Sequence, residues 1–102
     1  MKSLSIVIPV FNSQATIEEV VVRTVQVMNS EKLSYEVILV DDASSDDSWE
    51  KIEVLARENK NIIGLQLLQN SGQHSANLCG FRHSKNEIII TIDDDLQNPP
   101  EE

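Results

Sequence analysis

Three consecutive acids stand near the end of the chain, in the segment Asp93-Asp94-Asp95-Leu96-Gln97. In an extended backbone the side chains of Asp93 and Asp95 point the same way, because successive side chains alternate between two sides. Two carboxylates with the Gln97 amide nearby form the hard oxygen ligand set that Mg²⁺ or Mn²⁺ prefers. Such a metal shares its coordination with substrate phosphates and neutralises charge on a diphosphate leaving group. We therefore predict a metal site at Asp93, Asp95 and Gln97; the alternative is an acidic loop exposed to solvent.

A second acidic pair, Asp41-Asp42, follows the apolar segment 35–40. A carboxylate at a strand end can accept a hydrogen bond from the imide N–H of uracil or from another base donor. We predict that Asp42 faces the ligand and recognises the base, whereas Asp41 has a structural role. The alternative is that both acids cap the next helix, although Ser44-Ser45-Asp46 already provides caps.

Two further segments carry weaker signals. In the segment 8–12, Pro9 ends a predicted strand and Phe11 offers a flat apolar face on which a base could stack. The segment 70–76 opens a helix, so its free N–H groups could face phosphate. Within it, we interpret His74 as a hydrogen-bonded residue at the helix start rather than as a catalytic group.

The elements that must position these residues follow from hydrophobic patterning. Four short, nearly continuous apolar segments rich in β-branched residues predict strands buried on both faces of a parallel sheet. They are residues 4–8, 35–40, 62–68 and 87–92.

Helical patterns lie between the predicted strands. The first carries an apolar stripe of Ile17, Val20, Val21, Val25 and Met28. The second follows the segment 44–47 and would bury Trp49, Ile52, Leu55 and Ala56. The third runs from about Gly72 to Lys85, with a mostly small inner face formed by Ala76, Cys79, Gly80 and His83.

Alternating strands and helices predict an α/β fold with a parallel sheet. The strand order 3-2-1-4 is the usual solution, and it creates a switch point between strands 1 and 4 where ligands bind at the carboxyl ends. Residues 9–12, 41–42 and 93–95 would then meet at one edge of the sheet.

Composition narrows the class of protein. The chain has 102 residues, the size of one domain. Its net charge of −9 argues against nucleic acid or an anionic membrane as a partner. The single cysteine, Cys79, excludes an internal disulfide and is typical of a reducing compartment, so we predict a cytoplasmic protein. No apolar run approaches the ~18 residues of a membrane span.

The last five residues, Asn98-Pro99-Pro100-Glu101-Glu102, have the pattern of a helix start: a cap, proline in the first turn, then acids. The helix that this pattern announces does not follow. We therefore interpret residues 1–102 as a piece of a longer protein.

The motifs together resemble the family 2 glycosyltransferases. The resemblance rests on the order and spacing of four segments and covers essentially the whole chain. These segments are residues 5–12, 40–44, 70–76 and 91–101. The segment Asp95-Leu96-Gln97-Asn98-Pro99-Pro100-Glu101 is similar to the branch that transfers sugars to polyprenyl phosphates such as dolichyl and undecaprenyl phosphate.

The resemblance implies an A-type glycosyltransferase fold, which is Rossmann-like, and a nucleotide-diphosphate sugar donor, with a UDP-sugar favoured over a GDP-sugar. By matching position, the nucleotide would be held by Pro9, Phe11, Asn12, Asp42 and Asp93. Asp93, Asp95 and Gln97 would hold Mg²⁺ or Mn²⁺ and the diphosphate. The sugar would move by direct displacement at its anomeric carbon to an acceptor, a polyprenyl phosphate by this resemblance. Residues 1–102 would be the donor-binding half of the catalytic domain, with no catalytic base among them.

The chain departs from the family pattern at two positions. Ser13 stands where the family usually has Glu, and Asp94 stands where Ala or Gly is common. Because the acceptor half is missing, we expect this chain to bind the donor weakly without catalysing transfer. The exposed edge of the fourth strand would favour self-association.

Three other classes of protein are alternatives to this interpretation. A non-catalytic nucleotide-binding module differs only in whether a longer parent protein carries out chemistry. A phosphoacceptor receiver domain would place its acidic pair after strand 1, whereas here the pairs follow strands 2 and 4. A nicotinamide-binding Rossmann domain is excluded, because Gly64, Gly72 and Gly80 do not form the glycine fingerprint.

Overall fold

Strands and helices alternate strictly along the chain. The computed structural model describes residues 3–32, 34–84, 86 and 88–92, without the side chain of Gln73. Its elements are β1 (Ser3–Val10), α1 (Ile17–Ser30), β2 (Ser34–Asp41), α2 (Ser48–Glu58), β3 (Ile62–Gln66), α3 (Gln73–His83) and β4 (Ile88–Thr91). All strand pairs are parallel and the order is β3-β2-β1-β4, which confirms the predicted sheet and its switch point between β1 and β4.

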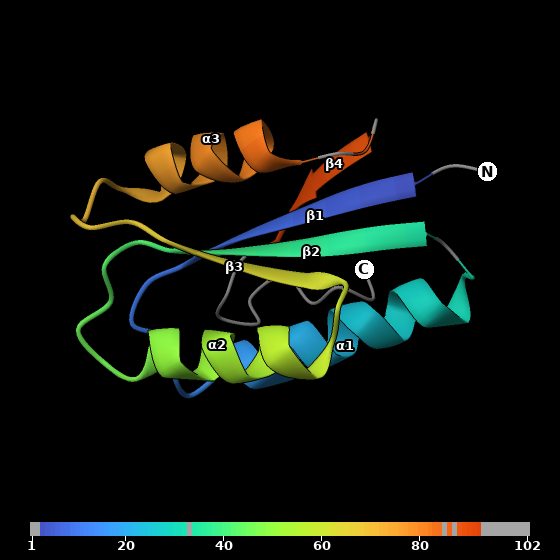
Figure 1. Cartoon of the computed structure of the whole chain (residues 1–102), viewed down its shortest axis with the longest axis horizontal. Coiled ribbons are helices and arrows are strands. Elements are labelled where there is room, and N and C mark those ends of the chain that lie inside the picture. Colours follow the sequence, from blue (N-terminus) through green and yellow to red (C-terminus); the bar gives the residue numbers. More distant parts are fainter. Residues whose placement is uncertain (1–2, 33, 85, 87, 93–102) are drawn as a thin grey trace.

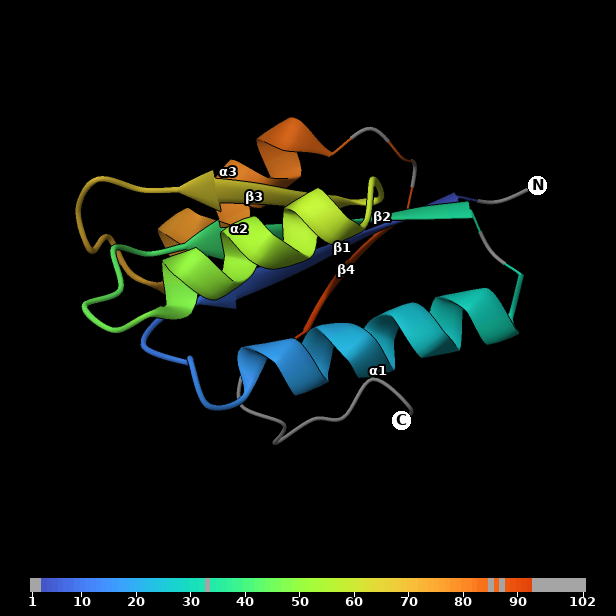
Figure 2. The ribbon, with the colours of Figure 1, turned by 60° about the horizontal axis from the view of Figure 1, so that its bottom comes forward.

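The helices cover the two faces of the sheet unequally. Helices α1 and α2 lie on one face and α3 lies on the other (Figure 1; Figure 2). Alternate residues of β1 enter different clusters: Ile6 and Ile8 pack toward α1 and α2, whereas Val7 packs with Ala76 of α3. The two central strands are therefore buried on both faces, as their continuous apolar sequences predict.

Strand β4 differs from the expectation. It pairs with β1 so that Ile90 lies opposite Ile6, but the side chains of Ile88, Ile89 and Ile90 are 36%, 41% and 39% exposed. The prediction that this strand is buried on both faces is wrong. Its outer edge has no neighbouring strand among the described residues, so neither face of β4 is fully covered.

Strand β1 continues past Pro9, where the sequence predicted its end. In a strand of a parallel sheet, the N–H and C=O groups of one residue point toward the same neighbouring strand. Those of the next residue point toward the strand on the other side. The Val10 carbonyl accepts from the N–H of Asp42, directly after β2, and the Val7 carbonyl accepts from the N–H of Ile92 on the β4 side. Pro9 therefore faces the β4 side, where β4 has already ended opposite Val7. Among the described residues, the missing N–H of proline therefore costs no ladder hydrogen bond.

Helix α3 lies very close to the sheet. A Cβ atom on Gly80 would fall 2.3 Å from Val7 Cγ1, so this position requires glycine. Ala76 is fully buried and Cys79 half-buried, as predicted for the inner face. His83 is exposed instead, and its Nδ1 lies 2.9 Å from the Cys79 carbonyl oxygen. Its predicted inward position is wrong because the helix ends there and leaves the sheet.

Replacing Gly80 by alanine tests this close contact. Alanine favours a helix by about 1 kcal/mol over glycine, but the clash with Val7 should outweigh that gain and destabilise the protein by about 1–2 kcal/mol. Urea unfolding of Gly80→Ala measures the net effect. The loss in Val7→Ala/Gly80→Ala should be smaller than the two single losses together, because the new methyl group occupies the vacated space. A stabilised Gly80→Ala would contradict the geometry.

Candidate functional site

The loops that follow β1, β2 and β3 gather at one end of the sheet, where the carboxyl ends of parallel strands meet (Figure 1). The acidic pair at the end of β2 lies at the centre of this end of the molecule. Asp41 is completely buried and Asp42 is 4% exposed. Buried carboxylates require hydrogen-bond donors, so the partners of these two residues reveal how the loops are held.

Asp41 closes the loop that follows its own strand. Its Oδ1 accepts from the Ser44 hydroxyl at 2.5 Å and its Oδ2 accepts from the Ser44 N–H at 3.1 Å. Ala43, between them, has a φ of 58°, which lies in the left-handed region. These contacts agree with the structural role predicted for Asp41.

Asn12 joins the loop after β1 to the loop after β2. Its backbone N–H donates to the Ser44 hydroxyl oxygen at 2.9 Å. Its side-chain Oδ1 accepts from the Ser45 N–H at 2.8 Å and from the Ser45 hydroxyl at 3.2 Å. Asn12 also has a φ of 51°, a conformation that asparagine tolerates better than most residues. In the structure, Asn12 Oδ1 therefore binds the loop after β2. The predicted contact of Asn12 with nucleotide stays a prediction.

Three more hydrogen bonds join the loop after β1 to the loop after β2 and to the first residue of α2. The Ser13 N–H donates to Ser48 Oγ at 2.8 Å, the Gln14 N–H to Asp46 Oδ2 at 3.2 Å, and the Asp47 N–H to Gln14 Oε1 at 2.8 Å. Sequence reasoning missed these contacts. The sequence shows a run of polar residues in each of the two loops, which indicates that the loops could form hydrogen bonds. It does not specify which donor meets which acceptor.

Asp46 carries a perturbed pKa within this network. Burial raises the pKa of its carboxyl, but hydrogen bonds from the Ser48 hydroxyl and from the Ser48 and Gln14 N–H groups outweigh it, so the pKa is lowered. A lowered folded-state pKa stabilises the protein above the unfolded value of about 3.9, and this contribution is lost as pH falls through the folded value. The contacts between the loops are therefore favoured at neutral pH.

Asp42 holds the third loop. Its Oδ1 accepts from the Ser71 N–H at 2.8 Å and its Oδ2 from the Gly72 N–H at 2.9 Å, while its carbonyl oxygen accepts from Asn70 Nδ2 at 3.3 Å. A carboxylate at the start of α3 also complements the helix dipole. The N–H groups of Ser71 and Gly72 therefore donate to Asp42 rather than to phosphate, and for residues 73–75 at the start of α3 the phosphate contact stays a prediction.

The other predicted contacts lie near these loops. Phe11 is 47% exposed directly after β1, where a base could reach its ring. Pro9 is buried within β1, so it shapes the backbone before Phe11 rather than presenting a surface. His74 is exposed in the first turn of α3.

The predicted metal ligands Asp93, Asp95 and Gln97 lie outside the described residues, as does Asp93 in its predicted nucleotide contact. The described chain ends close to them: the Ile92 N–H donates to the Val7 carbonyl oxygen at 3.1 Å, at the switch point beside β1. Within residues 3–32, 34–84, 86 and 88–92, no cluster of three or more His, Cys, Asp or Glu side chains forms a metal site.

Comparison with solved structures defines the class of fold. Crystal structures of Staphylococcus aureus TarS 1–349 match with a TM-score of 0.79, 27% identity and coverage of 93% of this chain and 28% of that chain. The TarS 1–349 complex with UDP-GlcNAc matches at 28% identity, a TM-score of 0.79 and coverage of 93% and 27%. The sheet order and flanking helices are those of the A-type glycosyltransferase fold.

The family profile described as glycosyl transferase family 2 matches residues 5–102, so the chain belongs to glycosyl transferase family 2. This membership excludes the receiver domain as the class of protein. The mannosyltransferase PcManGT from Pyrobaculum calidifontis, in complex with GDP-Man and Mn²⁺, shares the fold at 22% identity and a TM-score of 0.80, with coverage of 96% and 29%. The chain spans less than a third of the length of these structures.

Exchanging Asp42 for asparagine tests the hydrogen bonds that hold the third loop. Asparagine keeps one acceptor oxygen but places an NH₂ group against a backbone N–H, so Asp42→Asn should lose about 1–3 kcal/mol of unfolding free energy. Thermal or urea unfolding measures it. Asp47→Asn, an exposed acid in the preceding loop, is the matched control and should lose less than about 1 kcal/mol. Equal stability of the two variants would contradict the assignment.

Proposed function

We propose that the full-length protein transfers a sugar from a nucleotide-diphosphate sugar to an acceptor, and that this chain contributes the donor-binding half. One observation carries the proposal: in a family 2 chain, three loops are bound together around Asp41 and Asp42 at the edge where α/β folds bind ligands. TarS 1–349 has been crystallised with UDP and with UDP-GlcNAc, and PcManGT with GDP-Man, which supports a nucleotide-sugar donor. We propose a UDP-sugar as this donor.

The base would stack on Phe11, and Asp42 would accept from its imide N–H. Each oxygen of Asp42 has one backbone donor, and a carboxylate oxygen can accept a second hydrogen bond. Asp42 is only 4% exposed, however, so contact with the base requires the loop at Ser71 and Gly72 to shift. Donor binding and the position of this loop would then be linked.

A divalent cation, Mg²⁺ or Mn²⁺, would be held by Asp93, Asp95 and Gln97. The donor set fits, because carboxylate and amide oxygens suit both ions, and in the sequence these residues come directly after Ile92, which lies beside β1. The presence of Mn²⁺ in the PcManGT complex supports a divalent metal. When bound, the metal would supply charge neutralisation for the departing diphosphate.

The acceptor would be a polyprenyl phosphate, on the basis of the segment 95–101. An oxygen of that phosphate would form the new bond to the anomeric carbon while the bond to the diphosphate breaks, and the diphosphate would leave with the electron pair. Because the acceptor is already an anion, the step needs no strong general base. The acceptor-binding residues would lie in the remainder of a longer parent.

The parent would work in the cytoplasm, at the cytoplasmic face of the membrane that carries its lipid acceptor. None of the helices in the described ranges is long and apolar enough to cross a bilayer.

Calorimetric titration of UDP tests the donor site directly. Binding should require Mn²⁺ or Mg²⁺ and should weaken at least about tenfold in Asp93→Ala/Asp95→Ala, because the metal links protein and diphosphate. Glu31→Ala/Glu53→Ala removes the same charge from exposed positions and should bind like the unchanged protein. Absence of metal-dependent binding to UDP and GDP, in the presence of a folded chain, would contradict the proposal. Sugar transfer by the 102-residue chain alone would contradict its restriction to a donor half.

The same chain would self-associate through β4, where three isoleucines are each more than a third exposed and one strand edge is unpaired among the described residues. Light scattering over a range of concentrations should show dimers as the concentration rises. A monomer at every concentration would contradict this part of the proposal.

A further inference from the structure

Helices α1 and α2 lie on the same face of the sheet (Figure 2), and residues of both helices line a long groove between them. Two adjoining hollows form it, with volumes of about 500 Å³ and about 270 Å³, and both are lined by Leu55 and Glu58 of α2. Of the residues that line the groove, only Asp47 belongs to one of the three loops of the donor site, and the proposed sugar transfer uses none of them.

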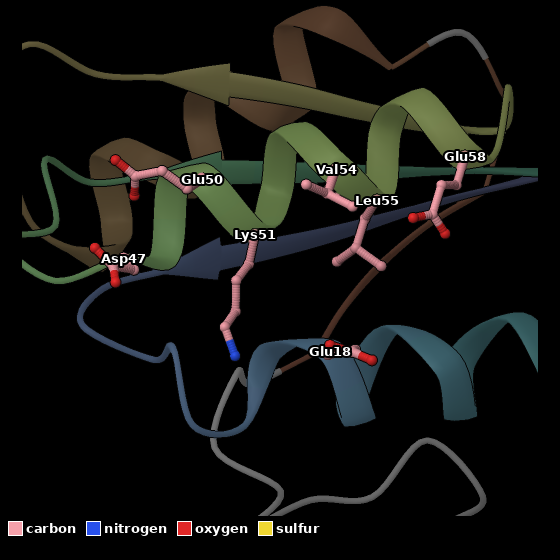
Figure 3. Close-up of a pocket in the computed structure, with 7 residues that line it drawn as sticks. All are labelled: Glu18, Asp47, Glu50, Lys51, Val54, Leu55 and Glu58. Carbon is pink, nitrogen blue, oxygen red and sulfur yellow. The ribbon is translucent and has the colours of Figure 1, made fainter.

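The larger hollow has a charged rim and an apolar floor (Figure 3). Its lining residues are Glu18, Asp47, Glu50, Lys51, Val54, Leu55 and Glu58. The lining of this hollow thus contains four carboxylates and one ammonium group. Figure 3 shows the Lys51 side chain extended from α2 toward the start of α1. In the part of the chain that the structure describes, no ion pair joins Lys51 to these carboxylates.

The smaller hollow continues the groove with an apolar lining. Val21, Val22 and Val25 of α1 face Leu55 and Ile62 across it. Two of the apolar side chains along the groove are unusually open to solvent: Val22 is 43% exposed and Val54 is 42% exposed. An apolar floor beneath a polar rim is the pattern of a surface that receives another protein segment.

We propose that this groove docks a basic amphipathic helix of a partner protein. Its apolar side chains would lie between Val22 and Val54, and its Lys or Arg side chains would face Glu18, Glu50 and Glu58. The charge complementarity argues for this occupant, since the rim has a large excess of carboxylates without cationic partners in the described chain. An acidic partner would be repelled.

The dimensions of the groove suit a helix of about three turns. Helix α2 has 11 residues and forms one wall along its length. At a rise of ~1.5 Å per residue, that wall is about 16 Å long. A docked helix of this length presents apolar residues at positions i, i+3 or i+4, and i+7, the spacing of helix-in-groove recognition.

A labelled synthetic peptide tests the proposal. The probe has about 14 residues, with leucine on one helical face and lysine on the other, and a second peptide carries glutamate in place of lysine. Fluorescence anisotropy with the 102-residue chain should show binding of the lysine peptide only. Affinity should fall as salt rises, because the contacts at the rim are exposed. Amide shifts in an NMR titration should concentrate at Val22, Val54 and Leu55.

Charge variants separate the groove from the general acidity of the chain. Glu50→Gln/Glu58→Gln should weaken binding of the lysine peptide about three- to tenfold, as expected for the loss of two exposed ion pairs. Glu31→Gln/Glu53→Gln removes the same charge from exposed positions that do not line the groove and should leave the affinity unchanged.

Three results would overturn the proposal. The first is equal binding of the lysine and glutamate peptides, and the second is an equal effect of the two pairs of substitutions. The third is a set of amide shifts centred on β4 instead of the groove. Binding that persists in the presence of UDP would be expected, since the groove is separate from the donor site.

Discussion

The arrangement of the loops depends on two adjacent acids, Asp41 and Asp42, that are buried at the end of β2. An ionised carboxylate removed from water costs several kcal/mol unless hydrogen-bond donors replace the water. Here each carboxylate accepts from two donors, with Ser44 serving Asp41 and the Ser71 and Gly72 N–H groups serving Asp42. The requirement to satisfy these charges fixes the loops after β2 and β3.

The alternation of side chains along β2 explains why the two acids serve different loops. Asp41 is the last residue of β2, and the N–H of Asp42 continues the pairing with β1 by donating to the Val10 carbonyl oxygen. Adjacent residues of an extended segment point to opposite faces, so the two carboxylates meet different hydrogen-bond donors. The loop after β1 is joined to the same unit through Asn12, which contacts Ser44 and Ser45. The loops at the carboxyl end of the apolar sheet are thus held together by hydrogen bonds between them. Such preorganisation suits a site that must align a donor for displacement.

The fold could be predicted largely from the sequence, because continuous apolar segments and helical stripes reflect burial directly. The errors have physical causes outside the local pattern. Burial of β4 depends on a neighbour that the described residues do not provide, and the continuation of β1 through Pro9 depends on where β4 ends. The position of His83 depends on where α3 leaves the sheet.

The sequence predicted which residue types gather at the candidate site, but not which hydrogen-bond partners they have. Asp41 was expected to be structural, and it is, because an acid followed by serines readily closes a turn. The contact of Asp42 with Ser71 and Gly72 joins residues about thirty positions apart, and no local pattern specifies such a pair. Sequence could show that polar groups gather at the carboxyl edge, whereas the hydrogen bonds that they form there required the three-dimensional fold.

Amide hydrogen exchange on the unchanged chain tests most directly whether Asp42 holds the loop before α3. Loop amides outside regular structure normally exchange fast, but the N–H groups of Ser71 and Gly72 should be strongly protected at neutral pH because they donate to a buried carboxylate. Gln69 is an exposed residue of the same loop, and its backbone amide provides the reference. Exchange of Ser71 and Gly72 as fast as that of Gln69 would contradict the account.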